Sequence, residues 1–262
     1  MVPTADKTPL TSSFDLLHAI EADELVLHYQ PIIDLDSRRT MSLEALVRWD
    51  HPVQGLMGPD RFLYMAENSA LGRILTGWVL DRALRDCAAW RDEGVKAGVS
   101  VNVLPEVMSP DWIVAHTAML LRRYDLPGHV LMVEITERRW PVELTHVQQT
   151  MQALAELGVC TSLDDFGMGD SSLARLARLR FDEIKIDRTF VADAADSPES
   201  RAIVRFSVDL ARTLGIRAVA EGVELAPDLE LVHSLGVDAA QGYLLAPPRP
   251  VDELAFADFQ HE

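Results

Sequence analysis

Eight short, mostly apolar runs recur along this chain, and longer segments with a helical spacing of apolar residues separate most of them. Short apolar runs bounded by turn residues are typical of buried strands, and the amphipathic segments between them are typical of helices. The runs cover residues 25–33, 41–49, 98–104, 130–136, 160–166, 183–187, 216–222 and 238–244. Eight strands with intervening helices over roughly 250 residues indicate an α/β fold, a TIM-like (β/α)8 barrel.

The connection between the first two runs breaks the regular barrel pattern. Only residues 34–40, DLDSRRT, lie between them. A crossover between parallel strands needs at least about a dozen residues, whereas a hairpin needs only a few. We therefore predict a barrel with one antiparallel strand, in which the first strand is reversed.

Helices are predicted in the longer gaps. Two fill the gap between the second and third strands, at 59–70 and 76–94. A third is predicted over 143–158, where apolar residues recur at spacings of three and four and Gly158 ends the pattern.

Composition favours a single soluble domain. The 262 residues are 48% hydrophobic, and we predict one barrel over residues 22–262, preceded by a flexible lead or linker remnant at 1–21. Cys87 and Cys160 are the only cysteines and no histidine cluster accompanies them, which argues against a disulfide framework or a zinc site. No signal peptide or membrane span is evident, so we expect a cytoplasmic protein without membrane contact.

The charge balance excludes one class of partner. Lys and Arg total 24 against 41 Asp and Glu, a formal charge of -17. Such a chain does not favour polymeric nucleic acid, because binding to a polyanion depends on cationic side chains. An anionic substrate would need bound cations as intermediaries.

Polar residues gather near the carboxyl ends of the predicted strands, which converge at one mouth of a barrel. They are Glu44, Asn102, Glu134, Glu137, Asp164, Asp165, Lys185, Asp187, Glu221, Glu224 and Gln241. Taken singly, each has an ordinary explanation: a solvated surface group, a turn residue, a helix cap or, for Lys185 and Asp187, a salt bridge. Their repetition at seven successive strand ends favours a shared site.

Converging carboxylates repel one another unless cations or protons neutralise them. Oxygen ligands without histidine or thiolate favour Mg²⁺ or Mn²⁺. The adjacent Asp164 and Asp165 can serve two neighbouring ions, one of the aspartates being shared. Two such ions polarise a phosphodiester and lower the pKa of a water molecule. Lys185 would hold that water and offset charge.

The same motifs resemble the EAL-domain cyclic di-GMP phosphodiesterases, in order from about Leu25 to Leu254. The matching segments are Glu44-Ala45-Leu46 with Arg48 and Trp49, VNV around Asn102, VEITE at 133–137, LDDFG at 163–167, DEIKIDRTFV at 182–191, AVAEGVE at 218–224 and AQGYLLAPP at 240–248. The resemblance implies hydrolysis of one phosphodiester bond of cyclic di-GMP to linear pGpG, with two Mg²⁺ or Mn²⁺ ions, in a homodimer.

The resemblance also implies roles for individual residues. The implied metal ligands are Glu44, Asn102, Glu134, Asp164 and Asp165, with Asp164 bridging the ions. Lys185 and Glu221 are implied to position and activate water, with Glu137 and Glu224 supporting the catalytic site. Residues implied to line the substrate site are Gln30, Leu46, Arg48, Asn102 and Gln241, of which Gln241 also completes the water network. Arg48 suits a phosphate through its forked donors, and its ordinary alternative is a surface ion pair.

Four positions depart from the family pattern without removing an implied ligand. Met168 and Asp170 replace a threonine and a tyrosine in a loop that couples the metal site to the dimer interface in the family. Leu104 stands where serine is common, and Pro247 where arginine is common. These changes bear on turnover rate and dimer coupling.

Three functions follow as hypotheses. The first is an active phosphodiesterase, which the complete ligand set favours. The second is a weak or inactive domain that senses cyclic di-GMP, which the altered loop favours. The third is a protein-interaction module indifferent to nucleotide, which accounts poorly for the acidic cluster because unused carboxylates gathered at one mouth would only destabilise the fold.

Overall fold

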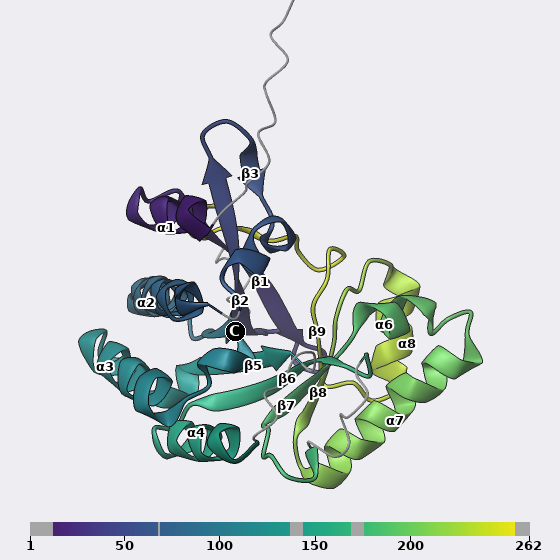
Figure 1. Ribbon diagram of the computed structural model, residues 1–262. Coiled ribbons are helices and arrows are strands. Elements are labelled where there is room, and N and C mark those ends of the chain that lie inside the picture. Colours follow the sequence, from purple (N-terminus) through teal and green to yellow (C-terminus); the bar gives the residue numbers. More distant parts are fainter. Residues whose placement is uncertain (1–12, 68, 137–143, 169–175, 255–262) are drawn as a thin grey trace, which may run out of the picture.

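A closed barrel of eight strands forms the centre of the protein (Figure 1). The computed structural model describes residues 13–67, 69–136, 144–168 and 176–254. The barrel strands are β1 (Leu25–Asp34), β2 (Thr40–His51), β4 (Gly98–Asn102), β5 (Leu131–Thr136), β6 (Cys160–Phe166), β7 (Glu183–Ile186), β8 (Arg217–Ala220) and β9 (Ala239–Ala240). Strands β2 and β4 to β9 are parallel in the barrel, whereas β1 is antiparallel to both β2 and β9. The predicted fold class, including the reversed first strand, is confirmed.

The turn between β1 and β2 lies beside β9, at the end of the barrel away from the mouth, and is held by Asp34, whose Oδ1 accepts hydrogen bonds from Ser37 N–H and Ser37 Oγ–H, both at 2.6 Å. At the other end, the first residues of β1 and the last residues of β2 extend beyond the mouth of the barrel (Figure 1). Two short strands that were not predicted lengthen this part of the sheet: β3 (Gly55–Met57) pairs with β2, and β10 (Arg249–Pro250) pairs with β1. Strands of two or three residues carry too little alternation to be seen in a sequence.

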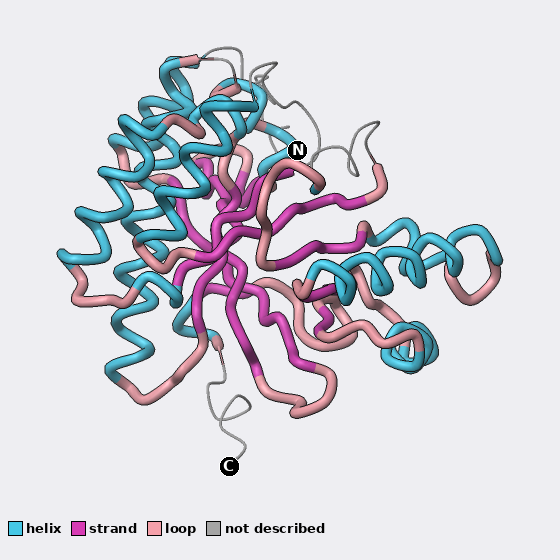
Figure 2. The backbone as a smooth tube through the Cα atoms, turned by 90° about the horizontal axis from the view of Figure 1, so that it is seen from below, coloured by secondary structure: helices cyan, strands magenta, loops and turns pink. Residues whose placement is uncertain are grey.

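Helices lie outside the strands (Figure 2). They are α1 (Ser13–Glu21), α2 (Ala70–Asp92), α3 (Ala115–Arg123), α4 (Leu144–Glu156), α6 (Arg188–Asp193), α7 (Pro198–Leu214) and α8 (Ala226–Ser234), with short helical turns η1 (Pro59–Arg61), η2 (Leu63–Met65), η3 (Pro105–Val107), η4 (Pro110–Val114), η5 (Gly128–Val130) and η6 (Val251–Glu253). The predicted helices at 143–158 and 76–94 correspond to α4 and to most of α2.

The predicted helix at 59–70 is wrong. The two turns η1 and η2 occupy this stretch, and Phe62 between them has φ −141°, outside the helical region. The Phe62 ring is fully buried and meets the Trp49 ring edge-on, with ring centroids 5.7 Å apart. Burying this aromatic pair under the hairpin outweighs the local preference for a continuous helix.

Helix α1 overlaps the segment expected as a lead or linker remnant. Its Leu16 and Ala19 are fully buried and belong to the main core. The domain boundary at residue 22 stays a prediction. Within the described parts of the chain, no helix combines the length and the apolar composition needed to cross a membrane.

Side chains on the barrel strands divide by face. Val133, Leu163 and Ile184 point outward into the core shared with the helices and are fully buried. Their neighbours Glu134 and Lys185 point into the barrel and are also fully buried. Because side chains alternate along a strand, an apolar outer face leaves the polar residues to fill the interior.

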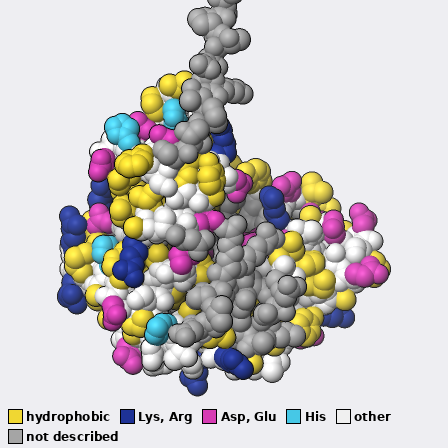
Figure 3. All heavy atoms as spheres, in the orientation of Figure 1, with side chains coloured by type: hydrophobic (Ala, Val, Ile, Leu, Met, Phe, Trp, Pro, Cys, Tyr) yellow, Lys and Arg dark blue, Asp and Glu magenta, His cyan; other side chains and the backbone are white. Residues whose placement is uncertain are grey.

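Surface charges are interspersed on the face seen in Figure 3. Several Lys and Arg side chains lie along its left edge, over α2 and α3, and acidic side chains are scattered around the rim. The excess negative charge of the chain is therefore not gathered in one patch on this face.

Candidate active site

Lys185 is the centre of the polar cluster inside the mouth of the barrel. Its side chain is fully buried in β7, and its Nζ lies 2.7 Å from Glu221 Oε1, 2.9 Å from Glu134 Oε2 and 3.2 Å from Glu44 Oε2. Asp164 Oδ1 is 3.8 Å away. The four carboxylates come from β2, β5, β6 and the end of β8, so the structure brings together residues that are far apart in sequence.

The charge of Lys185 is maintained by these neighbours. Burial by itself lowers the pKa of a lysine, because a low-dielectric interior disfavours the charged form. Here the surrounding carboxylates, Glu134 and Glu221 foremost, outweigh burial and raise the pKa of Lys185 well above its ordinary value. The ammonium is therefore charged at neutral pH.

The carboxylates around Lys185 share one ammonium, and their pKa values are shifted by different neighbours. Burial and the neighbouring charge of Glu44 raise the pKa of Glu134 well above its ordinary value. Burial and the charge of Asp164 do the same for Glu221, and burial raises the pKa of Asp164 although Lys185 opposes it. The cluster thus has surplus negative charge, which protons or further cations must neutralise.

Glu44 is the carboxylate that the protein itself satisfies best. Asn102 Nδ2 donates to Glu44 Oε1 at 2.7 Å, and Gln241 Nε2 donates to Glu44 Oε2 at 2.6 Å. Burial raises the pKa of Glu44, but Lys185 and these two amides outweigh it and lower the pKa below its ordinary value. Glu44 therefore remains ionised.

The reversed strand β1 contributes Gln30 to the same network. Gln30 lies opposite Glu44 in the β1–β2 register, and its Oε1 accepts a hydrogen bond from Gln241 Nε2 at 2.9 Å. Its own Nε2 donates to the carbonyl of Ala246 at 2.9 Å. Gln30 thereby connects the site to the segment that follows β9.

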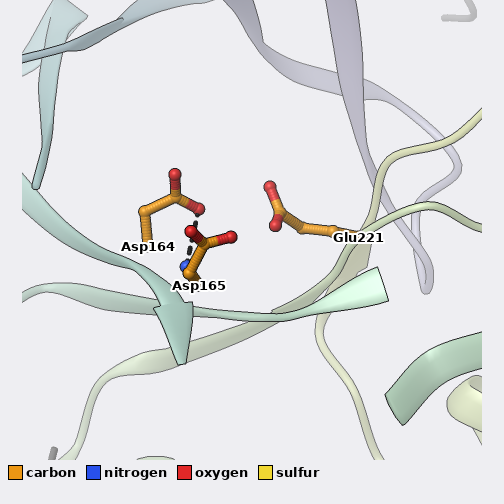
Figure 4. Close-up of side chains that lie close together, drawn as sticks. All are labelled: Asp164, Asp165 and Glu221. Carbon is orange, nitrogen blue, oxygen red and sulfur yellow. Dashed lines mark hydrogen bonds between the residues drawn. The ribbon is translucent and has the colours of Figure 1, made fainter. Parts of the chain in front are cut away.

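Asp164 and Asp165 lie on the same side of the chain at the end of β6. Adjacent residues of a strand normally face opposite ways. Asp165, however, has φ +55°, the left-handed conformation, and its N–H donates to Asp164 Oδ1 at 2.9 Å. Both carboxylates lie toward Glu221 (Figure 4), and one oxygen atom of each of the three residues lies within 4.8 Å of the others.

This donor set suits a hard divalent cation. All its donor atoms are oxygens, and the carboxylates outnumber the one ammonium that contacts them. Two buried acceptors, Glu134 Oε1 and Gln241 Oε1, have no hydrogen-bond partner among the described residues. Asp164, Asp165 and Glu221 could hold such an ion. Glu221, expected to act on water, thus lies among the candidate ligands.

A cavity of about 360 Å³ opens beside the cluster. Leu46, Asn102 and Asp165 line the end nearest the carboxylates, and Leu104 lies in its wall, where it supplies apolar surface instead of a hydroxyl. The apolar wall from η2 and α2, including Leu63 and Leu75, was not predicted. These residues do not lie near the end of a strand, and in the sequence they look the same as ordinary residues of the hydrophobic core.

Arg48 lies farther out along the hairpin. It follows Leu46 by two residues on β2, so both side chains point to the same face of the strand. Burial lowers the pKa of Arg48, while Tyr243, Glu44 and Asp60 oppose that effect. Its Nη1 donates to the carbonyl of Val47 at 2.9 Å. The half-buried guanidinium is a cation above the mouth.

The remaining predicted residues are exposed, lie at the edge of the cluster or fall outside the described chain. Glu224 is exposed. Asp187 accepts a hydrogen bond from Thr189 N–H at 2.8 Å and caps α6, and its negative charge adds to burial in raising the pKa of Asp164. Glu137 and Asp170 lie outside the described residues. Met168 is 39% exposed.

Comparison with known proteins gives one consistent family. A model of the EAL domain family matches residues 14–248. The cyclic di-GMP phosphodiesterase NbdA of Pseudomonas aeruginosa is 38% identical over 241 residues, 92% of this chain and 31% of its own length. The cyclic di-GMP phosphodiesterase PdeR of Escherichia coli is 37% identical over 236 residues, 90% of this chain and 36% of its own length.

A solved structure agrees with these sequence relatives. The structure described as PaMucR phosphodiesterase in complex with c-di-GMP superposes with a TM-score of 0.86 at 37% identity, covering 92% of this chain and 98% of that one. The present chain spans about a third of the length of the curated relatives it matches.

Proposed function

Because this chain belongs to the EAL domain family, we propose that it hydrolyses one phosphodiester bond of cyclic di-GMP to give linear pGpG, using two Mg²⁺ or Mn²⁺ ions. The observation that carries the proposal is the gathering of oxygen ligands, Asp164, Asp165 and Glu221, beside the buried Lys185. The names of the relatives support the substrate, and a homodimer is part of the same proposal.

The ions would be held by the acidic residues of the mouth. The proposed ligands are Glu44, Asn102, Glu134, Asp164 and Asp165, with Glu221 close enough to join them. When bound, the ions supply Lewis-acid chemistry, lowering the pKa of a water molecule and stabilising charge on the phosphodiester. This assignment explains why so many carboxylates share one lysine.

Lys185 is proposed to hold the attacking water, and Glu221 is proposed to accept its proton. An ammonium has three donors and no acceptor, and Glu44, Glu134 and Glu221 take all three. Lys185 would therefore hold a water oxygen in place of one of these carboxylates. Glu221 Oε1 lies 2.7 Å from Lys185 Nζ, so a water held by Lys185 would be within reach of this carboxylate, which would act as the general base. The proton would pass from the water to a Glu221 oxygen.

Substrate binding is assigned to the wall above the mouth. Arg48 would pair with a phosphate through its forked donors, and Leu46 would contact the dinucleotide from the cavity edge. Gln30 and Gln241 would hold the network that orients Glu44. Glu137 and Glu224 remain proposed supporting residues.

The proposal is tested by product formation. Purified protein with Mn²⁺ and cyclic di-GMP is expected to yield pGpG, measured by chromatography, and a chelator is expected to abolish the product. Glu44→Gln removes one ligand charge at nearly constant volume and is expected to abolish turnover, while Asp209→Asn, at an exposed position of α7, serves as the matched control. Absence of product with both Mg²⁺ and Mn²⁺ would reject the enzyme.

The altered loop supports a second candidate, a module that binds cyclic di-GMP without cleaving it. Met168 stands where the family usually has threonine, two residues after the end of β6. Calorimetry showing tight binding together with no pGpG would favour this sensor, and rapid turnover would eliminate it as the main role.

A further inference from the structure

The short helix α6 lies against both of the loops that carry the acidic cluster. It follows β7 directly, and Asp187 at its N-terminus is two residues from Lys185. We propose that Phe190 of α6 is a positioning residue, whose ring holds the turn containing Asp165 so that the Asp165 carboxylate lies beside Glu221. This inference rests on the proposed cation-dependent function.

Phe190 contacts the turn at Gly167. A methyl group placed on Gly167 would lie 2.8 Å from Cε2 of Phe190, so only a hydrogen atom fits between the backbone and the ring. Gly167 also has φ +100°, which favours glycine. Met168 N–H donates to the carbonyl of Asp165 at 3.2 Å and closes the turn over Gly167. The ring therefore supports the turn that begins at Asp165.

The backbone at Asp165 depends on such support. Its φ of +55° lies in the left-handed region, which costs less for aspartate than for most residues with a Cβ atom but still favours surroundings that hold the backbone there. In an extended strand conformation Asp165 would face away from Asp164 and from Glu221. The contact between Phe190 and Gly167 thus helps to determine the direction in which the Asp165 carboxylate points.

The first residue of α6 fixes the opposite loop. Gly222, directly after Glu221, has φ +65° and no room for a side chain, because a Cβ there would collide with Cβ of Arg188. Glu221 N–H donates to the carbonyl of Ile186 at 3.1 Å. Both carboxylate loops are therefore held against the same helix, α6, through which the separation of Asp165 from Glu221 is set.

The experiment compares two substitutions within α6. Phe190→Ala removes the ring that touches Gly167, and Val191→Ala, at a fully buried neighbour in the core, is the matched control for lost packing. Mn²⁺ binding is measured in the absence of substrate by electron paramagnetic resonance, which gives the concentration of free Mn²⁺ directly. We expect Phe190→Ala to bind Mn²⁺ about 10- to 100-fold more weakly, the range found for residues that orient metal ligands.

The outcomes of this experiment separate failure of the positioning role of Phe190 from failure of the proposed function. Wild-type affinity in Phe190→Ala, or an equal loss in Val191→Ala, would overturn the positioning role while leaving the proposed function intact. No Mn²⁺ binding by the wild-type protein would overturn both. If circular dichroism shows Phe190→Ala to be unfolded, Phe190→Leu decides, since leucine keeps an apolar side chain in α6 but does not extend as far as Cε2.

Discussion

The substitution Lys185→Met removes the buried ammonium while keeping an unbranched side chain of similar length. Three carboxylate oxygens lie within 3.2 Å of Nζ, on Glu44, Glu134 and Glu221. Breaking a buried ion pair by deleting one partner costs about 3–5 kcal/mol, because the remaining charge is left uncompensated. At about pH 8 in the presence of a chelator, we expect Lys185→Met to lower the free energy of unfolding by this amount. The melting temperature should then be lower by roughly 6–20 °C.

The penalty should depend on pH in a defined direction. Burial raises the pKa of Glu134 and Glu221 above ordinary values, and loss of the Lys185 charge raises them further. A carboxylate whose pKa is raised by folding contributes stability below its unfolded pKa and loses that contribution as pH rises through the folded pKa. The cost of Lys185→Met should therefore be smaller at about pH 5.5 than at about pH 8.

Urea denaturation in a chelator at the two pH values measures this cost. The double variant Lys185→Met/Glu134→Gln removes one of the surplus charges, so its cost should be less than the sum of the two single changes. A cost below about 1 kcal/mol at pH 8, or one that does not change with pH, would refute the role assigned to the ammonium.

Three further predictions concern other groups. Mn²⁺ should raise the melting temperature more at about pH 8 than at about pH 5.5, because protons must leave Glu134 and Glu221, whose pKa values are raised chiefly by burial, before a cation binds; an equal shift at both values would contradict this. Tyr29→Phe should cost about 1.5–3 kcal/mol in urea denaturation, because Tyr29 Oη donates to the buried Asp86 at 2.8 Å, and an unchanged midpoint would count against that bond. Burial raises the pKa of Cys87 to about 12, so mass spectrometry should find this thiol unmodified by an alkylating reagent in the native protein and modified after unfolding.

The barrel and its reversed strand could be predicted from the sequence because both depend on local patterns. Each barrel strand coincides with an apolar run, and the seven residues at 34–40 are too few for a crossover. Strand ends were less certain: the run at 238–244 contains only the two-residue strand Ala239–Ala240. The chain turns away there because Gly242 packs directly against the backbone of Val223.

Long-range packing decided what local patterns missed. The helix predicted at 59–70 fails because Phe62 turns inward to meet Trp49, which is close to it only in the folded hairpin. Glu221 and Glu224 look alike in the sequence, three residues apart after a strand. The structure places Glu221 on Lys185 and leaves Glu224 exposed, because the chain bends at Gly222.

The sequence by itself determined the fold class and the inventory of candidate donors, since strand periodicity and the position of polar residues at strand ends are local properties. The tertiary structure alone decided how those donors share charge. Barrel closure places several carboxylates around one ammonium, and packing turns Asp165 toward its neighbours. The strength and direction of electrostatic interactions depend on distance and burial, and neither quantity is written in the order of residues along a chain.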